Sequence, residues 1–128
     1  MLNKFCKKPL YEVTRTMADV AMGRKKADLV IKNARLVNVC TCEIQEGIDV
    51  AIAEGRIALF GSTDHCIGKN TKVIDASGQY IAPGFMDAHI HVESSMISVG
   101  EYARAVVPHG TTGIFMDPHE ICNVCGTS

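Results

Sequence analysis

Two histidines separated by a single residue are the clearest chemical feature of this sequence. His89 and His91 lie in the apolar segment FMDAHIHV. Side chains on a β-strand alternate between its faces, so a strand here points both imidazoles to the same side. Neutral imidazole is a good ligand for divalent transition metals. The pair therefore predicts a metal site, and two histidines on a solvated strand face are the structural alternative.

Acidic residues flank this pair. Asp87 comes two positions earlier on the same expected face, and Glu93 comes two positions later if the strand continues. We interpret Asp87 as structural or as support behind the metal ligands, because it lies deeper in the strand. Glu93 either supports the ligands, contacts the substrate, or begins a helix cap with Ser94 and Ser95.

A second polar cluster, Asp117-Pro118-His119-Glu120, follows the apolar segment TTGIFMD. Pro118 restricts the backbone of the turn. His119 and Glu120 are the candidate catalytic residues, because they could orient water, carry protons or contact a substrate. The alternative is a capped turn with a surface His–Glu pair.

Three segments are expected to position these residues. Residues 1–26 are polar and mixed, with a short amphipathic helix over 13–22. Residues 27–82 contain short β-branched segments separated by Gly, Asn and Asp, which predict a small antiparallel β domain. Within it, Glu54-Gly55 is expected to form a turn between two strands.

Residues 83–128 predict a strand, a helix over 99–107 and a second strand. A strand–helix–strand order is typical of the beginning of a parallel α/β fold. Two parallel strands cannot bury both faces of a sheet by themselves. We therefore expect this unit to be incomplete in the chain.

The composition narrows the class of protein. The chain has 128 residues, with 13 Lys and Arg against 14 Asp and Glu, so bulk charge predicts no nucleic-acid or membrane partner. No apolar stretch is long enough to cross a bilayer, and the first residues lack a secretory signal. We therefore expect a cytoplasmic protein whose six cysteines are free thiols.

The phrase YIAPGFMDAHIHVESSM resembles the first barrel strand of the metal-dependent amidohydrolase superfamily, over nine consecutive positions from Pro83 to His91. The phrases HIHVESSM and GTTGIFMDPHEICNVCG are similar to the adenine deaminase family within it. KADLVIKNARLVNV and DVAIAEGRIALFG resemble the small β domain that precedes the barrel in that family. The resemblance implies an α/β fold in which a small β-sandwich-like domain precedes the start of a (β/α)8 barrel.

This resemblance also implies an activity. His89 and His91 would be ligands of a two-metal site holding manganese or iron. A metal-activated hydroxide would convert adenine to hypoxanthine and ammonia, a step of adenine catabolism. The remaining ligands would come from later barrel strands, so the chain as given is expected to be inactive alone. The full-length protein is expected to form a homo-oligomer.

Other interpretations stay open. The same strand pattern occurs in other cyclic amidohydrolases, such as dihydroorotase-like enzymes and imidazolone hydrolases. His91 and Glu93 with Cys122 and Cys125 imitate the zinc site of cytidine-deaminase-like enzymes, although Ile121 stands where that signature has proline. A non-enzymatic β module is the third alternative.

Overall fold

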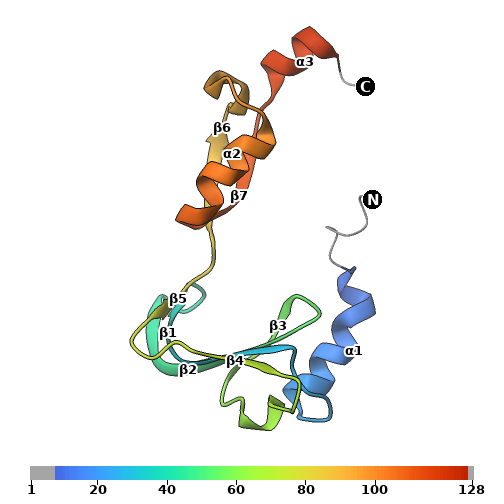
Figure 1. Cartoon of the computed structure of the whole chain (residues 1–128), viewed down its shortest axis with the longest axis vertical. Coiled ribbons are helices and arrows are strands. Elements are labelled where there is room, and N and C mark those ends of the chain that lie inside the picture. The colour runs from blue at the N-terminus through green and yellow to red at the C-terminus, as the bar shows by residue number, and fades with distance from the viewer. Residues whose placement is uncertain (1–7, 127–128) are drawn as a thin grey trace. The chain divides into compact units, whose positions relative to one another are not determined.

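A computed structural model describes residues 8–126 of the chain (Figure 1). The chain divides into two compact units, Met1–Ala82 and Pro83–Ser128. No helix in the described part is both long and apolar enough to cross a bilayer.

The first unit combines one helix with a single sheet. It contains α1 (Leu10–Ala21), β1 (Leu29–Asn38), β2 (Glu43–Ala53), β3 (Arg56–Gly61), the short 3-10 helix η2 (Asp64–Cys66), β4 (Lys72–Asp75) and β5 (Tyr80–Ile81). The strand order is β3-β2-β1-β4, and β5 pairs with the other part of β1. The strands thus form one five-stranded sheet, which corrects the expectation of a sandwich-like domain.

The pairing directions also differ from the expectation. β2 is antiparallel to β1 and β3, whereas β4 and β5 are parallel to β1. The expected all-antiparallel domain is therefore wrong. The segment containing η2 carries the chain from β3 across the sheet to the far side of β1, so β4 runs in the same direction as β1.

The core of this unit lies between α1, η2 and the sheet. Val20 of α1 and Cys66 of η2 are fully buried against Val30, Ala51 and Ala53 of the sheet. Burial raises the pKa of the Cys66 thiol, whose Sγ donates to the carbonyl of Val20. Cys66 is therefore a protonated packing residue at neutral pH.

The predicted Glu54-Gly55 turn is confirmed. β2 ends at Ala53 and β3 begins at Arg56, so two residues connect them. Both turn residues have positive φ, 52° for Glu54 and 68° for Gly55. Positive φ at both central positions is the geometry that matches the twist of a hairpin.

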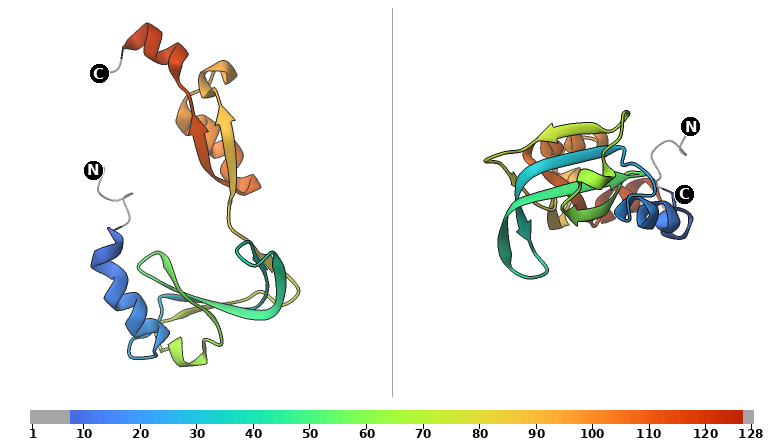
Figure 2. Two further views of the ribbon diagram at one scale, coloured as in Figure 1. Left: turned by 180° about the vertical axis from the view of Figure 1, so that it is seen from behind. Right: turned by 90° about the horizontal axis from the view of Figure 1, so that it is seen from below.

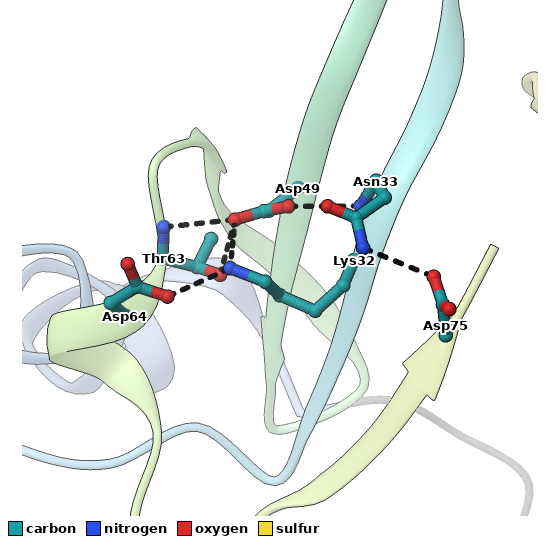
Figure 3. A network of polar contacts seen from close by, with 6 residues as sticks. All are labelled: Lys32, Asn33, Asp49, Thr63, Asp64 and Asp75. Atoms are coloured by element: carbon teal, nitrogen blue, oxygen red, sulfur yellow. Dashed lines mark hydrogen bonds and ion pairs between the residues drawn. The ribbon is translucent and has the colours of Figure 1, made fainter. Parts of the chain in front are cut away.

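A polar network joins β1, β2, η2 and β4 (Figure 3). Lys32 Nζ lies 2.6 Å from Asp49 Oδ2 and 2.8 Å from Asp64 Oδ1. Asp49 also accepts from the backbone N–H groups of Asn33 and Thr63. Burial acts to raise the pKa of Asp49, but the bonds from Lys32, Asn33 and Thr63 outweigh it, and the pKa lies below its ordinary value.

The second unit is a parallel strand–helix–strand unit, as predicted. It contains β6 (Phe85–Ile90), η3 (Val92–Ser95), α2 (Val99–Val106), η4 (Val107–His109), β7 (Thr111–Met116) and α3 (His119–Cys125). β6 and β7 pair in parallel, with α2 on one face of the pair (Figure 2).

Two local features stabilise the connection from β6 through α2 to β7. The Ser98 hydroxyl accepts from the backbone N–H of Glu101 and caps α2. Gly84 lies so close to Thr112 that a Cβ there would come within 2.7 Å of the Thr112 Cβ. The absence of a side chain at Gly84 therefore lets the beginnings of β6 and β7 approach each other.

Candidate metal centre

His89 and His91 lie at the carboxyl end of β6. His89 is within the strand and His91 follows its last residue. Their Nε2 atoms are 2.9 Å apart and their ring planes are nearly perpendicular. The two imidazoles therefore point to the same side, as strand alternation predicted. Two nitrogens bound to one ion at right angles would be about 2.9 Å apart, and in a tetrahedral site about 3.3 Å, so this spacing suits a shared cation.

The second nitrogen of His91 is also held in place. Nδ1 lies 2.8 Å from the backbone carbonyl oxygen of Asp117. A carbonyl oxygen only accepts hydrogen bonds, so this contact assigns the proton of a neutral His91 ring to Nδ1. Nε2 then keeps its lone pair on the side of His89. Such a contact from the other ring nitrogen is the usual way in which a metal-binding imidazole is oriented.

Asp87 does not join the imidazoles. Its Oδ1 accepts from the backbone N–H of His89 at 3.1 Å. The pairing of β6 with β7 is irregular between Asp87 and Ile90. This contact stabilises the irregular strand end that carries His89, which agrees with a structural function for the carboxylate.

The predicted turn Asp117-Pro118-His119-Glu120 leads directly into α3 at His119. His119 Nδ1 lies 3.3 Å from Asp117 Oδ2, and the His119 and His91 ring centroids are 4.9 Å apart. The potential ligand atoms of His91, Asp117 and His119 all lie within 4.8 Å of one another. The structure thus brings His119 beside the histidine pair.

The Asp117 carboxylate was missed as a candidate by the reasoning from sequence. Its signal was the spacing: Asp117 and His119 are separated by one residue, as are His89 and His91. Ile90 pairs with Met116, so His91 and Asp117 each follow a paired residue at the same edge of the sheet. Two such pairs after adjacent parallel strands predict a shared cluster.

Glu93 and Glu120 lie on the two segments that follow β6 and β7. β6 ends before Glu93, which lies in η3 rather than on the strand face. Glu93 Oε1 accepts the backbone N–H of Glu120 at 3.2 Å, while its Oε2 is buried without a partner among the described residues. The Ser94 hydroxyl lies 3.4 Å from Glu120 Oε2. Glu93 therefore holds the beginning of α3 rather than capping a helix of its own.

The cysteines of the described residues take no part in this arrangement. Cys122 and Cys125 lie on α3. Across residues 8–126, the group of three or more His, Cys, Asp or Glu side chains arranged for a metal ion is His91, Asp117 and His119, without a cysteine. The geometry therefore gives no support to the cytidine-deaminase-like alternative.

The segment that carries the histidine pair is similar to known proteins. The model of the amidohydrolase family matches residues 80–128. The chain is 69% identical over 126 residues to an adenine deaminase of Clostridium botulinum, which covers 98% of this chain and 21% of that protein. It is 58% identical over 120 residues to an adenine deaminase of Mesorhizobium japonicum, covering 93% of this chain and 20% of that protein.

Solved structures show a similar fold. L-hydantoinase (dihydropyrimidinase) from Arthrobacter aurescens superposes with a TM-score of 0.56 at 24% identity, covering 72% of this chain and 21% of that chain. A molinate hydrolase structure superposes with a TM-score of 0.53 at 23% identity, covering 71% of this chain and 24% of that chain. The chain spans about a fifth of the length of the curated relatives it matches. Over residues 80–128 the chain is similar to the amidohydrolase family, and over nearly its whole length it is similar to one part of these adenine deaminases.

Proposed function

We propose that this chain is part of an enzyme that deaminates adenine hydrolytically to hypoxanthine and ammonia. The observation that carries the proposal is the His89–His91 pair, with Nε2 atoms 2.9 Å apart, in a chain 69% identical to a protein named adenine deaminase. The likeness to the hydantoinase supports only the fold, so it favours no second substrate.

The donor set fits a divalent transition metal. His91 Nδ1 contacts a carbonyl oxygen and leaves Nε2 free to bind, next to Nε2 of His89. Neutral imidazole suits zinc, iron and manganese alike. We propose manganese or iron in a two-metal site to which His89 and His91 contribute ligands. When bound, the cation lowers the pKa of water and so supplies a nucleophile near neutral pH.

The protein residues have distinct functions in this proposal. His89 and His91 hold the cation, and the Asp117 carbonyl fixes the orientation of the His91 ring. The water oxygen adds to the ring carbon that bears the amine, and the amine leaves as ammonia. A carboxylate beside the site can take one proton from the water and deliver it to the ring nitrogen next to the attacked carbon, and the second proton of the water goes to the departing amine. We assign this transfer to Glu120, whose side chain is exposed and whose backbone N–H donates to Glu93 at the start of α3.

Location and assembly remain predictions for the longer protein. We propose a cytoplasmic, self-associating enzyme whose partner is adenine itself. The 128-residue chain alone is expected to be inert, because the ligands that it offers are too few for a two-metal site.

A chimera tests the function without any assumption about the ends of this chain. This chain would replace the 126 aligned residues of the Clostridium botulinum relative, and ammonia and hypoxanthine would be measured with adenine and Mn²⁺. We expect turnover by the chimera, none by its His89→Asn/His91→Asn variant, and none by the chain alone. A folded, metal-loaded chimera that leaves adenine unchanged would contradict the proposed substrate.

A further inference from the structure

We infer that Asp117 and His119 are metal ligands, and that together with His91 they hold one divalent transition-metal ion between the ends of β6 and β7. This inference concerns the site of the proposed function and rests on its metal-binding character, but not on adenine as the substrate. It changes the function expected for His119 from proton transfer to metal binding.

The parallel pairing of two strands creates this cluster. Ile90 of β6 pairs with Met116 of β7, and the next residues are His91 and Asp117. The Asp117 carbonyl contacts His91 Nδ1, and the Asp117 carboxylate contacts His119 Nδ1. Because both strand ends belong to one hydrogen-bonded pair, the three ligands are positioned before an ion arrives.

The distances are compatible with one ion. The candidate ligand atoms of the three residues lie within 4.8 Å of one another. Atoms bound to a common zinc at 2.0–2.2 Å in a tetrahedral site are about 3.3–3.6 Å apart, so side-chain rotations of about an ångström would bring these atoms to one ion. His91 and His119 are already edge to face, with centroids 4.9 Å apart.

The charge of the second unit favours a cation at this place. Residues 83–128 contain five acidic residues and one basic residue, Arg104. Arg104 pairs with Glu101 on α2. The carboxylates of Asp117, Glu93 and Glu120 therefore have no lysine or arginine within this unit to neutralise them. An isolated exposed ion pair between Asp117 and His119 would contribute little, whereas a divalent ion would balance several of these charges.

The ligand types indicate the class of metal. Two imidazoles and one carboxylate form a set used for divalent iron, and imidazole and carboxylate also bind zinc and manganese. A set of three ligands leaves coordination positions open for water. His89, whose Nε2 faces His91, is available as a further ligand but is not required for the three-residue set.

The test measures metal binding by the untagged 128-residue chain under reducing conditions. Co²⁺ is titrated and followed by visible absorption and calorimetry, for the original chain and for the variants His119→Asn and Asp117→Asn. The matched control is His109→Asn, because His109 lies in η4 before β7 begins, at the other end of that strand. Circular dichroism of every variant checks that it is folded.

We expect one Co²⁺ per chain, at least about tenfold weaker binding in His119→Asn and Asp117→Asn, and unchanged binding in His109→Asn. Equal affinity of the original chain and both variants would overturn the inference, as would thiolate-to-metal charge-transfer absorption that disappears in Cys122→Ser/Cys125→Ser. If the chain alone binds Co²⁺ too weakly to be measured, the same variants are made in the chimera, and their Co²⁺ affinities are compared by competition with a chelator. Weaker binding in the variants again supports the inference, and equal binding overturns it. The chimera could be folded and yet not deaminate adenine, while its variants bind Co²⁺ more weakly. This outcome would contradict adenine as the substrate but would support Asp117 and His119 as metal ligands.

Discussion

The backbone N–H of Glu120 donates to Oε1 of Glu93 across 3.2 Å, linking the segments that follow β6 and β7. The two residues are 27 positions apart in the chain. The bond fixes the first turn of α3, which carries His119. Side chains that contribute to a metal site from two strands need such a link, because each loose segment adds an entropy cost to binding.

Glu93→Ala should loosen the beginning of α3. Loss of the carboxylate leaves the Glu120 N–H to water, at a cost of about 1 kcal/mol for one hydrogen bond, or roughly fivefold faster local opening. Amide hydrogen exchange at Glu120 measures this change. Glu93→Gln is the matched variant, because its amide oxygen can still accept. Equal protection of Glu120 in both variants and in the original chain would show that the bond does not hold α3.

His91→Asn should impair metal binding more than His89→Asn does. His91 belongs both to the histidine pair and to the set formed with Asp117 and His119, whereas His89 belongs only to the pair. We expect no measurable Co²⁺ binding in His91→Asn, and weakened binding in His89→Asn. Calorimetric titration of the two variants checks this order. Stronger binding by His91→Asn than by His89→Asn would mean that His91 is not the shared ligand.

The elements that local sequence determines could be predicted, and those that depend on distant contacts could not. The two-residue turn Glu54-Gly55 and the parallel order of β6, α2 and β7 follow from residue types within a few positions. The topology of the sheet in the first unit depends on the edge of β1 with which β4 pairs, and no pattern of neighbouring residues determines that edge. The sheet was therefore expected to be antiparallel and is mixed.

The candidate site shows the same division. The common orientation of His89 and His91 follows from alternation along a strand, and the contact between His91 and Asp117 depends on the register of β6 against β7. Glu93 would lie on the strand face only if the strand continued to it, but β6 ends at Ile90 and the carboxylate contacts the start of α3 instead. Strand ends are the least determined part of such a pattern.

Gly84→Ala should destabilise the second unit. The added Cβ would overlap the Thr112 side chain and push the beginnings of β6 and β7 apart. Overpacking of this kind costs about 1–3 kcal/mol. We expect a lower unfolding midpoint in urea and weaker Co²⁺ binding, because the strand ends that carry the ligands would shift. Gly100→Ala in α2 is the control, since the nearest atom to its added Cβ is 3.8 Å away.

Gly100→Ala should leave the midpoint unchanged or raise it slightly, because alanine favours helix over glycine. If Gly84→Ala and Gly100→Ala unfold at the same urea concentration, the close approach of Gly84 to Thr112 is not needed for the pairing of β6 with β7.

Asp49→Asn should destabilise the first unit at neutral pH, and the effect should shrink in acid. The Asp49 side chain is 8% exposed and bonds to Lys32, Asn33 and Thr63. Leaving its buried partners poorly paired costs about 1–3 kcal/mol. Because the folded pKa of Asp49 is lowered, its stabilisation is complete above the ordinary value of about 3.9 and is lost as pH falls through the folded pKa.

The pKa of Lys32 is raised, first by its bond to Asp49 and then by its bond to Asp64. The contribution of Lys32 to folding stability is therefore lost only as the pH rises through that raised pKa. Urea unfolding followed by circular dichroism, at neutral pH and well below about pH 3.9, tests whether the effect of Asp49→Asn shrinks in acid. Asp64→Asn is the matched control, because Asp64 also bonds to Lys32 but its side chain is 82% exposed. Solvent already stabilises that carboxylate, so its loss should change the unfolding midpoint much less. Equal effects of Asp49→Asn and Asp64→Asn would show that burial at Asp49 does not strengthen the pair.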